Sequence, residues 1–137
     1  MRTVVLPAHV RRELESLAVA AYPEEGCGVL LGKPTPQGPS VVRVLACGNV
    51  AEDRRRAYLL EPLEYLAAER AASSCDLEVV GIWHSHPDGA PVPSETDRVQ
   101  AWGGWSYVIA ATSQAGVTGL RAWRLRQDVF TEEDIHP

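Results

Sequence analysis

Two histidines separated by one residue, His84 and His86, are the residues whose types and spacing most clearly suggest chemistry. They end a mostly apolar segment, and Pro87 follows them directly. In a β-strand, residues i and i+2 point to the same face, so both imidazoles can be directed at one point. Imidazole nitrogen is a common zinc ligand. The segment therefore suggests a metal site at the end of a strand.

A third ligand is available in Asp97, which stands three positions after Ser94, beyond a loop rich in proline and glycine. Ser94 is suited to be the N-cap of a helix whose first turn carries Asp97. Three protein ligands leave one position of a tetrahedral zinc site open for water, as in catalytic zinc sites. Zinc lowers the pKa of bound water to about 7, and a nearby carboxylate can carry its proton to a leaving group.

Each part of this pattern also has a simpler interpretation. A His-x-His pair at the end of a strand is often structural, with both rings held by hydrogen bonds. Ser94-x-x-Asp97 alone is more often a helix cap than a site. The combination with the break at Pro87 and a strand–loop–helix context favours the zinc site.

Two other metal sites can be compared with the same segment. His84-x-His86-x-Asp88 resembles the opening of the two-metal motif of metallo-β-lactamase-like hydrolases, but Gly89 stands where that motif has another histidine. The two remaining histidines, at positions 9 and 136, are too few for its later ligands, and the chain is short for that fold. A zinc deaminase is excluded because H-x-E and P-C-x-x-C are both absent.

Composition limits the class of protein. The chain has 137 residues and a formal net charge of −5, which argues against a general nucleic-acid-binding surface. It shows no secretory signal and no apolar run long enough to span a bilayer, so we expect no membrane partner. Three widely spaced cysteines without a C-x-x-C pair suit reduced thiols in a cytoplasmic protein.

The elements that must position these residues alternate between strands and helices. Short apolar or alternating runs predict strands over residues 3–6, 27–32, 41–50, 77–84, 107–112 and 117–127. Helical spacing and caps predict helices over residues 7–22, 62–74 and 94–102. We expect one α/β domain over residues 1–137, with a mixed, mainly antiparallel sheet, about three flanking helices, and a loose polar tail over 131–137.

The site residues resemble those of a known family. His84-Ser85-His86-Pro87 followed by Ser94-x-x-Asp97 resembles the JAMM (MPN+) motif of zinc isopeptidases. The segment PEEGCGVLLG, residues 23–32, is similar to the bacterial form E-x-C-G-x-L-x-G of the family's N-terminal strand. Asn49 and the Tyr58-x-x-x-Pro62 stretch also match short bacterial members. The resemblance covers roughly residues 4–125.

This resemblance implies a sheet flanked by helices in a cytidine-deaminase-like arrangement, with one Zn²⁺ per chain held by His84, His86 and Asp97. It also implies that Glu25 acts as general base and then as general acid, a choice over Glu24 that spacing alone does not make. The hydroxyl of Ser94 would donate to the developing oxyanion.

In size and in the E-x-C-G form, the chain is most similar to the bacterial CysO-cysteine peptidase (Mec) branch. That branch implies a zinc metallopeptidase that hydrolyses an amide bond at the C-terminal Gly-Gly of a ubiquitin-like sulfur carrier. Two alternatives remain: a catalytically silent MPN scaffold that only binds partners, and a zinc hydrolase of a small peptide or small-molecule amide. Trp102 and Trp105 can shape a substrate groove or the contact of a homodimer.

Overall fold

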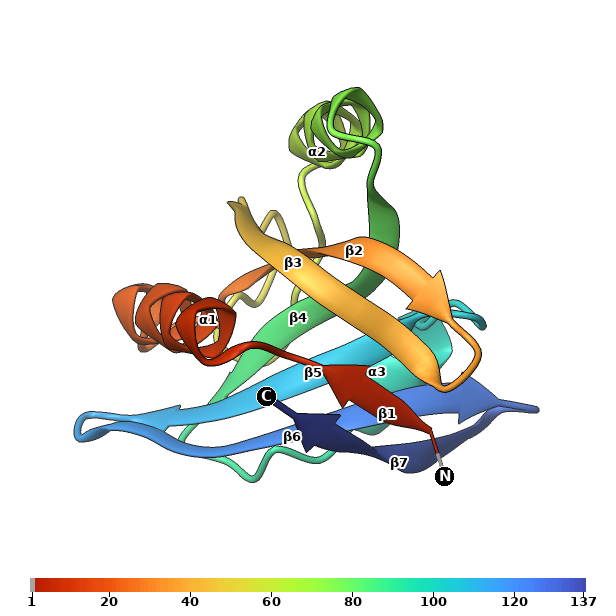
Figure 1. Cartoon of the computed structure of the whole chain (residues 1–137). Coiled ribbons are helices and arrows are strands. Elements are labelled where there is room, and N and C mark those ends of the chain that lie inside the picture. Colours follow the sequence, from red (N-terminus) through yellow and green to blue (C-terminus); the bar gives the residue numbers. More distant parts are fainter. Residues whose placement is uncertain (1) are drawn as a thin grey trace.

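The computed structural model describes residues 2–137, in seven strands and three helices (Figure 1). In chain order the elements are β1 (Thr3–Val5), α1 (Ala8–Ala21), β2 (Cys27–Thr35), β3 (Gly38–Cys47), α2 (Pro62–Ser74), β4 (Glu78–Pro87), α3 (Glu95–Gln100), β5 (Ser106–Ser113), β6 (Gly116–Arg126) and β7 (Val129–His136).

The strands form one closed barrel in the order β1-β3-β2-β4-β5-β6-β7. Pairing is parallel between β4 and β5 and between β1 and each of its neighbours, β3 and β7, and it is antiparallel elsewhere. The expected mixed, mainly antiparallel sheet with three helices is confirmed. Closure of that sheet into a barrel was not predicted.

The C-terminal segment corrects one expectation. Residues 131–137 were predicted to be a loose polar tail, but most of them belong to β7, which pairs with β6 on one side and with β1 on the other. Charged side chains such as Glu132 and Asp134 gave the segment its loop-like composition. In the barrel the strand presents these charges to ion pairs and solvent, while its backbone completes the sheet.

Helix α1 covers one side of the barrel with the apolar stripe that its sequence predicts. Val10, Leu14 and Ala18 are fully buried against a core that includes Trp83 and Leu30. The helix follows Pro7 and ends before Pro23, as proline at each position favours. Figure 1 shows α1 beside the barrel and α2 over the opposite end of β4.

The central strands β2 and β4 separate two apolar clusters. Trp83 belongs to the cluster beneath α1, whereas Ile82 belongs to a second cluster with Cys27, Tyr58 and α2. Gly28 lies where β2 passes closest to its neighbours, because a Cβ there would collide with the Leu45 carbonyl and the Trp83 indole. Strand alternation therefore places His84 on the face of Ile82, away from α1.

Across residues 2–137, no helix is long and apolar enough to cross a membrane.

Candidate metal centre

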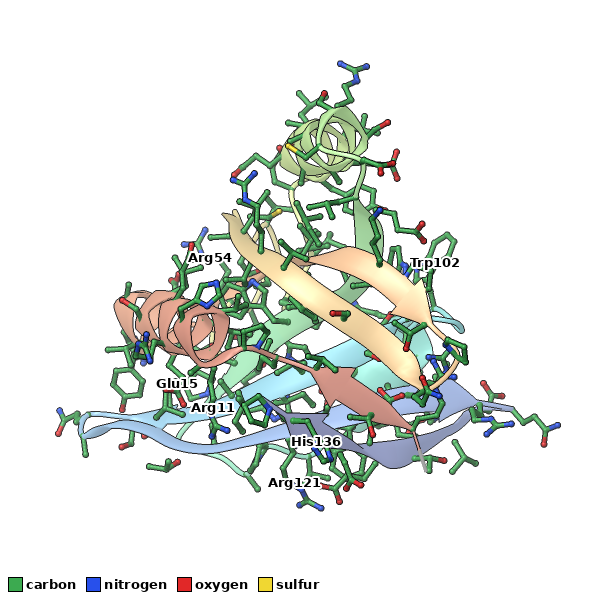
Figure 2. The ribbon with its side chains drawn as sticks, in the orientation of Figure 1. Arg11, Glu15, Arg54, Trp102, Arg121 and His136 are labelled. Atoms are coloured by element: carbon green, nitrogen blue, oxygen red, sulfur yellow. The ribbon has the colours of Figure 1, made fainter. Side chains whose placement is uncertain are left out.

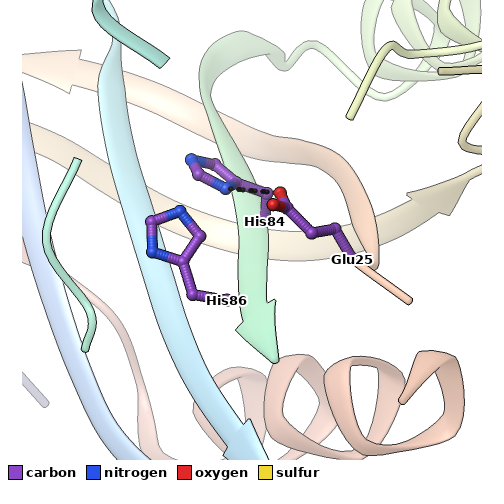
Figure 3. A group of neighbouring side chains, drawn as sticks. All are labelled: Glu25, His84 and His86. Carbon is purple, nitrogen blue, oxygen red and sulfur yellow. Dashed lines mark ion pairs between the residues drawn. The ribbon is translucent and has the colours of Figure 1, made fainter. Parts of the chain in front are cut away.

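His84 and His86 lie at the C-terminal end of β4, between β2 and β5. His84 pairs with Cys27 on one side and Ile109 on the other, so its backbone is fixed in the middle of the sheet. Its side chain is 1% exposed, against 13% for His86. Figure 3 shows both imidazoles on one side of the strand, as their spacing predicts, with their ring centroids 5.0 Å apart.

Helix α3 brings Asp97 to the histidines through a capping box. The Ser94 hydroxyl accepts from the Asp97 amide at 3.0 Å, and the Ser94 amide donates to Asp97 Oδ2 at 2.9 Å. The same Oδ2 lies 3.0 Å from His86 Nε2 and 3.9 Å from His84 Nε2. The three ligand residues expected from the sequence are therefore brought together, with Ser94 as the predicted N-cap.

The hydrogen bonds of His86 indicate that this cluster suits a cation. Its Nδ1 lies 2.9 Å from the carbonyl oxygen of Ala90, which can only accept, so Nδ1 carries the proton. In the neutral ring, Nε2 then directs a lone pair at Asp97 Oδ2, itself an acceptor, only 3.0 Å away. A proton or a metal ion between them removes this repulsion. Two imidazole nitrogens and a carboxylate oxygen are a typical donor set for zinc.

Electrostatics keep Asp97 in the form that binds metal. Burial raises the pKa of Asp97, but the hydrogen bond with His86, the nearby His84 and the Ser94 amide together lower it below its usual range. Burial lowers the pKa of His86, but its hydrogen bonds to Asp97 and the Ala90 carbonyl outweigh burial and raise it. The carboxylate is thus ionised at neutral pH, as a ligand must be.

Glu25 lies beside the histidines, from the segment just before β2, and is 4% exposed. Its Oε1 is 3.5 Å from His84 Nδ1 (Figure 3), and both atoms are buried without a hydrogen-bond partner among the described residues. Glu25, His84 and His86 each offer a ligand atom within 4.8 Å of the others. A carboxylate in this place can either bind a cation or exchange a proton with a water molecule beside it.

Most of the chain is similar to a known protein family. Residues 7–126 match the model of the prokaryotic homologues of the JAB domain. The chain belongs to this family. The Archaeoglobus fulgidus JAB1/MPN domain protein supports the same fold, with a TM-score of 0.59 at 15% identity, over 100% of this chain and 98% of that one.

Three relatives of this JAB-domain protein carry the names of a desampylase, a conjugate-cleaving protease and a peptidase. It is 41% identical to a desampylase of Haloferax volcanii over 65% of this chain and 63% of that protein, so the match spans less than two thirds of the relative. It is 32% identical to a probable TtuB-protein conjugate cleaving protease of Thermus thermophilus over 88% of this chain and 74% of the relative. It is also 32% identical to the CysO-cysteine peptidase of Mycobacterium tuberculosis over 94% of this chain and 82% of the relative.

In this JAB domain, Tyr58 also lies at the site, although the sequence analysis assigned it no role. Its ring stacks on His84, with centroids 4.3 Å apart and an interplanar angle of 23°. Burial raises the pKa of Tyr58 well above its ordinary value, so the phenol stays neutral. No periodicity places Tyr58 near His84, and only its match to short bacterial members of the family singled it out.

An apolar groove begins at Tyr58 and extends between α2 and the segment that follows α3. It has a volume of about 580 Å³. Its lining is almost entirely apolar and includes Leu60, Tyr65, Leu66, Ile82, Trp102 and Trp105. Trp102 is 69% exposed and projects at the edge of the molecule (Figure 2). The expectation that Trp102 and Trp105 shape a groove near the site is therefore supported by their place in its wall.

Proposed function

We propose that this JAB-domain protein is a zinc metallopeptidase that hydrolyses the amide bond after the C-terminal Gly-Gly of a ubiquitin-like, sulfur-carrier-type protein. The observation that carries the proposal is the convergence of His84, His86 and Asp97 beside the buried, unpartnered carboxylate of Glu25. The three free cysteines suit a reducing compartment, so we assign the protein to the cytoplasm.

In this proposal His84, His86 and Asp97 hold one zinc ion. Zinc supplies a Lewis acid that lowers the pKa of water and polarises a carbonyl group. The unpaired acceptors of the site support a cation there better than they support a purely structural pair of histidines.

Glu25 and Ser94 provide the proton transfers and the hydrogen bond that the reaction needs. The Glu25 carboxylate takes a proton from the attacking water and returns it to the leaving amine nitrogen, which avoids expelling an amide anion. The Ser94 oxygen already accepts from the Asp97 amide, so its own proton is left to donate to the carbonyl oxygen as negative charge develops.

The apolar groove supports a protein substrate rather than a small amide. It leads away from Tyr58, the residue that packs on His84, and exposes Leu66 and Trp102 at its wall. Contiguous exposed apolar surface beside a site is typical of protein recognition. Two glycines at the end of a carrier have no side chains, so such a tail can lie close to buried ligand residues.

The first test measures zinc content and cleavage in the same preparations. We expect about one zinc per chain and release of a lysine-derived amine from a ubiquitin-like protein joined to it through Gly-Gly, but slow cleavage of a Gly-Gly dipeptide amide. His84→Ala should lose both zinc and cleavage, because a ligand is removed. His9→Ala is the matched control, since His9 is exposed on α1 and outside the site.

Two outcomes would contradict the proposal. Wild-type protein that takes up no zinc after metal is added would identify a silent scaffold. Equal rates on the dipeptide amide and the carrier conjugate would identify a small-amide hydrolase and leave the groove without a role in recognition.

A further inference from the structure

The segment that carries Glu25 lies outside the regular strand pairing. β2 begins at Cys27, two residues later, so no ladder of backbone bonds fixes Glu25. Its amide donates instead to the Arg54 carbonyl at 2.7 Å, from the loop that follows β3. The next residue, Gly26, is held to β4 because its amide donates to the buried Ser85 hydroxyl at 2.7 Å. The orientation of Glu25 therefore depends on groups far from it in the sequence.

The Glu25 carbonyl accepts a hydrogen bond from the side chain of Asn49. Asn49 Nδ2 donates to the Glu25 carbonyl and to the Ala57 carbonyl, each at 3.0 Å. Its Oδ1 accepts from the amides of Ala51 at 3.0 Å and Leu59 at 3.1 Å. An amide group has two N–H donors and two lone pairs, so Asn49 uses its full capacity. A half-buried side chain this completely bonded is rigid.

These four bonds connect Glu25 to the other side of the site. Three of the partners, Ala51, Ala57 and Leu59, belong to the 50–60 loop, which also carries Tyr58. Tyr58 stacks on His84. Asn49 thus sets the distance between the main chain of Glu25 and the loop that packs on a metal-ligand histidine.

We propose that Asn49 is a positioning residue that holds Glu25 in the orientation required for proton transfer. This inference rests on the proposed function, in which Glu25 is the general base. The hydrogen bonds of the Asn49 side chain go to Glu25, Ala51, Ala57 and Leu59, none of which is a proposed metal ligand. Asn49 acts through the Glu25 main chain, and a small displacement of a catalytic group can reduce turnover by about 100-fold.

Kinetics of two Asn49 variants provide the first test. Asn49→Asp keeps the shape and both acceptor bonds but loses the two donors, and Asn49→Ala loses all four bonds. We expect kcat to fall about 10- to 100-fold in both variants, with KM within about twofold and zinc content unchanged. Thr35→Ala is the matched control, because it removes the Thr35 hydroxyl bonds in the β2–β3 turn, far from Glu25.

A double variant distinguishes positioning of Glu25 from general destabilisation. If Asn49 acts through Glu25, Asn49→Ala added to Glu25→Gln should lower kcat no further than Glu25→Gln alone. Independent effects that multiply would overturn the inference. Cleavage by the wild type, together with a large but still measurable fall of kcat in Glu25→Gln, verifies the proposed function separately, so the two proposals can fail independently.

A spectroscopic readout does not depend on activity. Asn49 is the only asparagine in the chain, so selective ¹⁵N labelling gives one side-chain amide pair in the spectrum of the whole protein. Both of its protons are donated to carbonyl groups, and we expect their exchange with solvent to be at least tenfold slower than in a free asparagine side chain. Exchange at the free rate would overturn the inference.

Discussion

At the scale of single residues, unsatisfied hydrogen-bonding capacity marks the candidate metal centre. His84 Nδ1 and Glu25 Oε1 are buried polar atoms that find no protein partner in the part of the chain described, and the acceptors of His86 and Asp97 face each other. Leaving such groups unpaired costs roughly 1–3 kcal/mol each. A fold that keeps these atoms together gains when a cation and water complete their bonding. This is the residue-level reason to expect zinc.

Differences in burial among the three cysteines predict which thiol reacts. Burial raises the pKa of Cys27 to about 12 and that of Cys47 to about 11, whereas Cys75 is exposed. Thiolate is the reactive form, and at pH 8 the thiolate fraction of Cys27 is about one part in ten thousand. We expect an aromatic disulfide reagent to modify one thiol rapidly in the native protein and three in denaturant.

Cys75→Ser is the control for this measurement and should abolish the rapid phase. A rapid phase that survives in Cys75→Ser would mean that the β2–β3 end of the barrel opens readily, because Cys27 and Cys47 are paired across these two strands.

At the scale of elements, α3 is only six residues long, yet it carries Asp97, the third ligand that we propose. Its position depends on the capping box, because the Ser94 side chain fixes the first turn and the Asp97 carboxylate is held by the Ser94 amide. A cap of this kind stabilises a helix by about 1 kcal/mol. The helix therefore acts as a short support that sets where Oδ2 points.

Two substitutions of Ser94 test its role, because one removes the helix cap and the other keeps it. Ser94→Ala removes both the cap acceptor and the hydroxyl donor, so we expect turnover to fall about 100- to 1,000-fold. The Asp97 amide should exchange faster with solvent at the same time, because its acceptor is lost. Ser94→Thr keeps the hydroxyl and should retain both properties within a few-fold. Full activity of Ser94→Ala would contradict the role we assign to Ser94.

At the scale of the whole molecule, a buried carboxylate links the strands that close the barrel. Glu133 on β7 is 3% exposed. It accepts from the buried Ser106 hydroxyl on β5 at 2.6 Å and from Arg2 Nε at 3.2 Å. Arg124 on β6 approaches the same carboxylate at 3.9 Å. These contacts join the N-terminus, the C-terminal strand and the centre of the sheet.

Glu133→Ala should destabilise the protein by about 3 kcal/mol, because the substitution leaves the buried Ser106 hydroxyl and the Arg2 guanidinium without their acceptor and removes the negative charge beside Arg124. Urea unfolding followed by circular dichroism measures the change. The matched control is the neighbouring Glu132→Ala, which removes a half-exposed ion pair with Arg121 and should change stability by less than about 1 kcal/mol. Equal effects of the two variants would show that barrel closure does not depend on Glu133.

The sequence by itself determined the features that depend on neighbours along the chain. Strand alternation placed His84 and His86 on one face, and Ser94 was identified as the cap that carries Asp97. Helical spacing predicted α1 to within about one residue. Such signals are local because hydrogen bonds within a helix turn, and the alternation of a strand, involve residues only a few positions apart.

Only the tertiary structure decided which distant segments meet. Tyr58 lies on His84, and Asn49 holds the Glu25 carbonyl across 24 positions of sequence. Glu133 bonds Arg2 across 131 positions of sequence. This contact helps hold the C-terminal segment, which has the composition of a polar loop, as the strand that closes the barrel. A segment of polar residues has the same local sequence whether its side chains are hydrogen-bonded to solvent or to buried partners. The way in which the sheet closes determines these partners, and closure depends on contacts between segments that are far apart in the sequence.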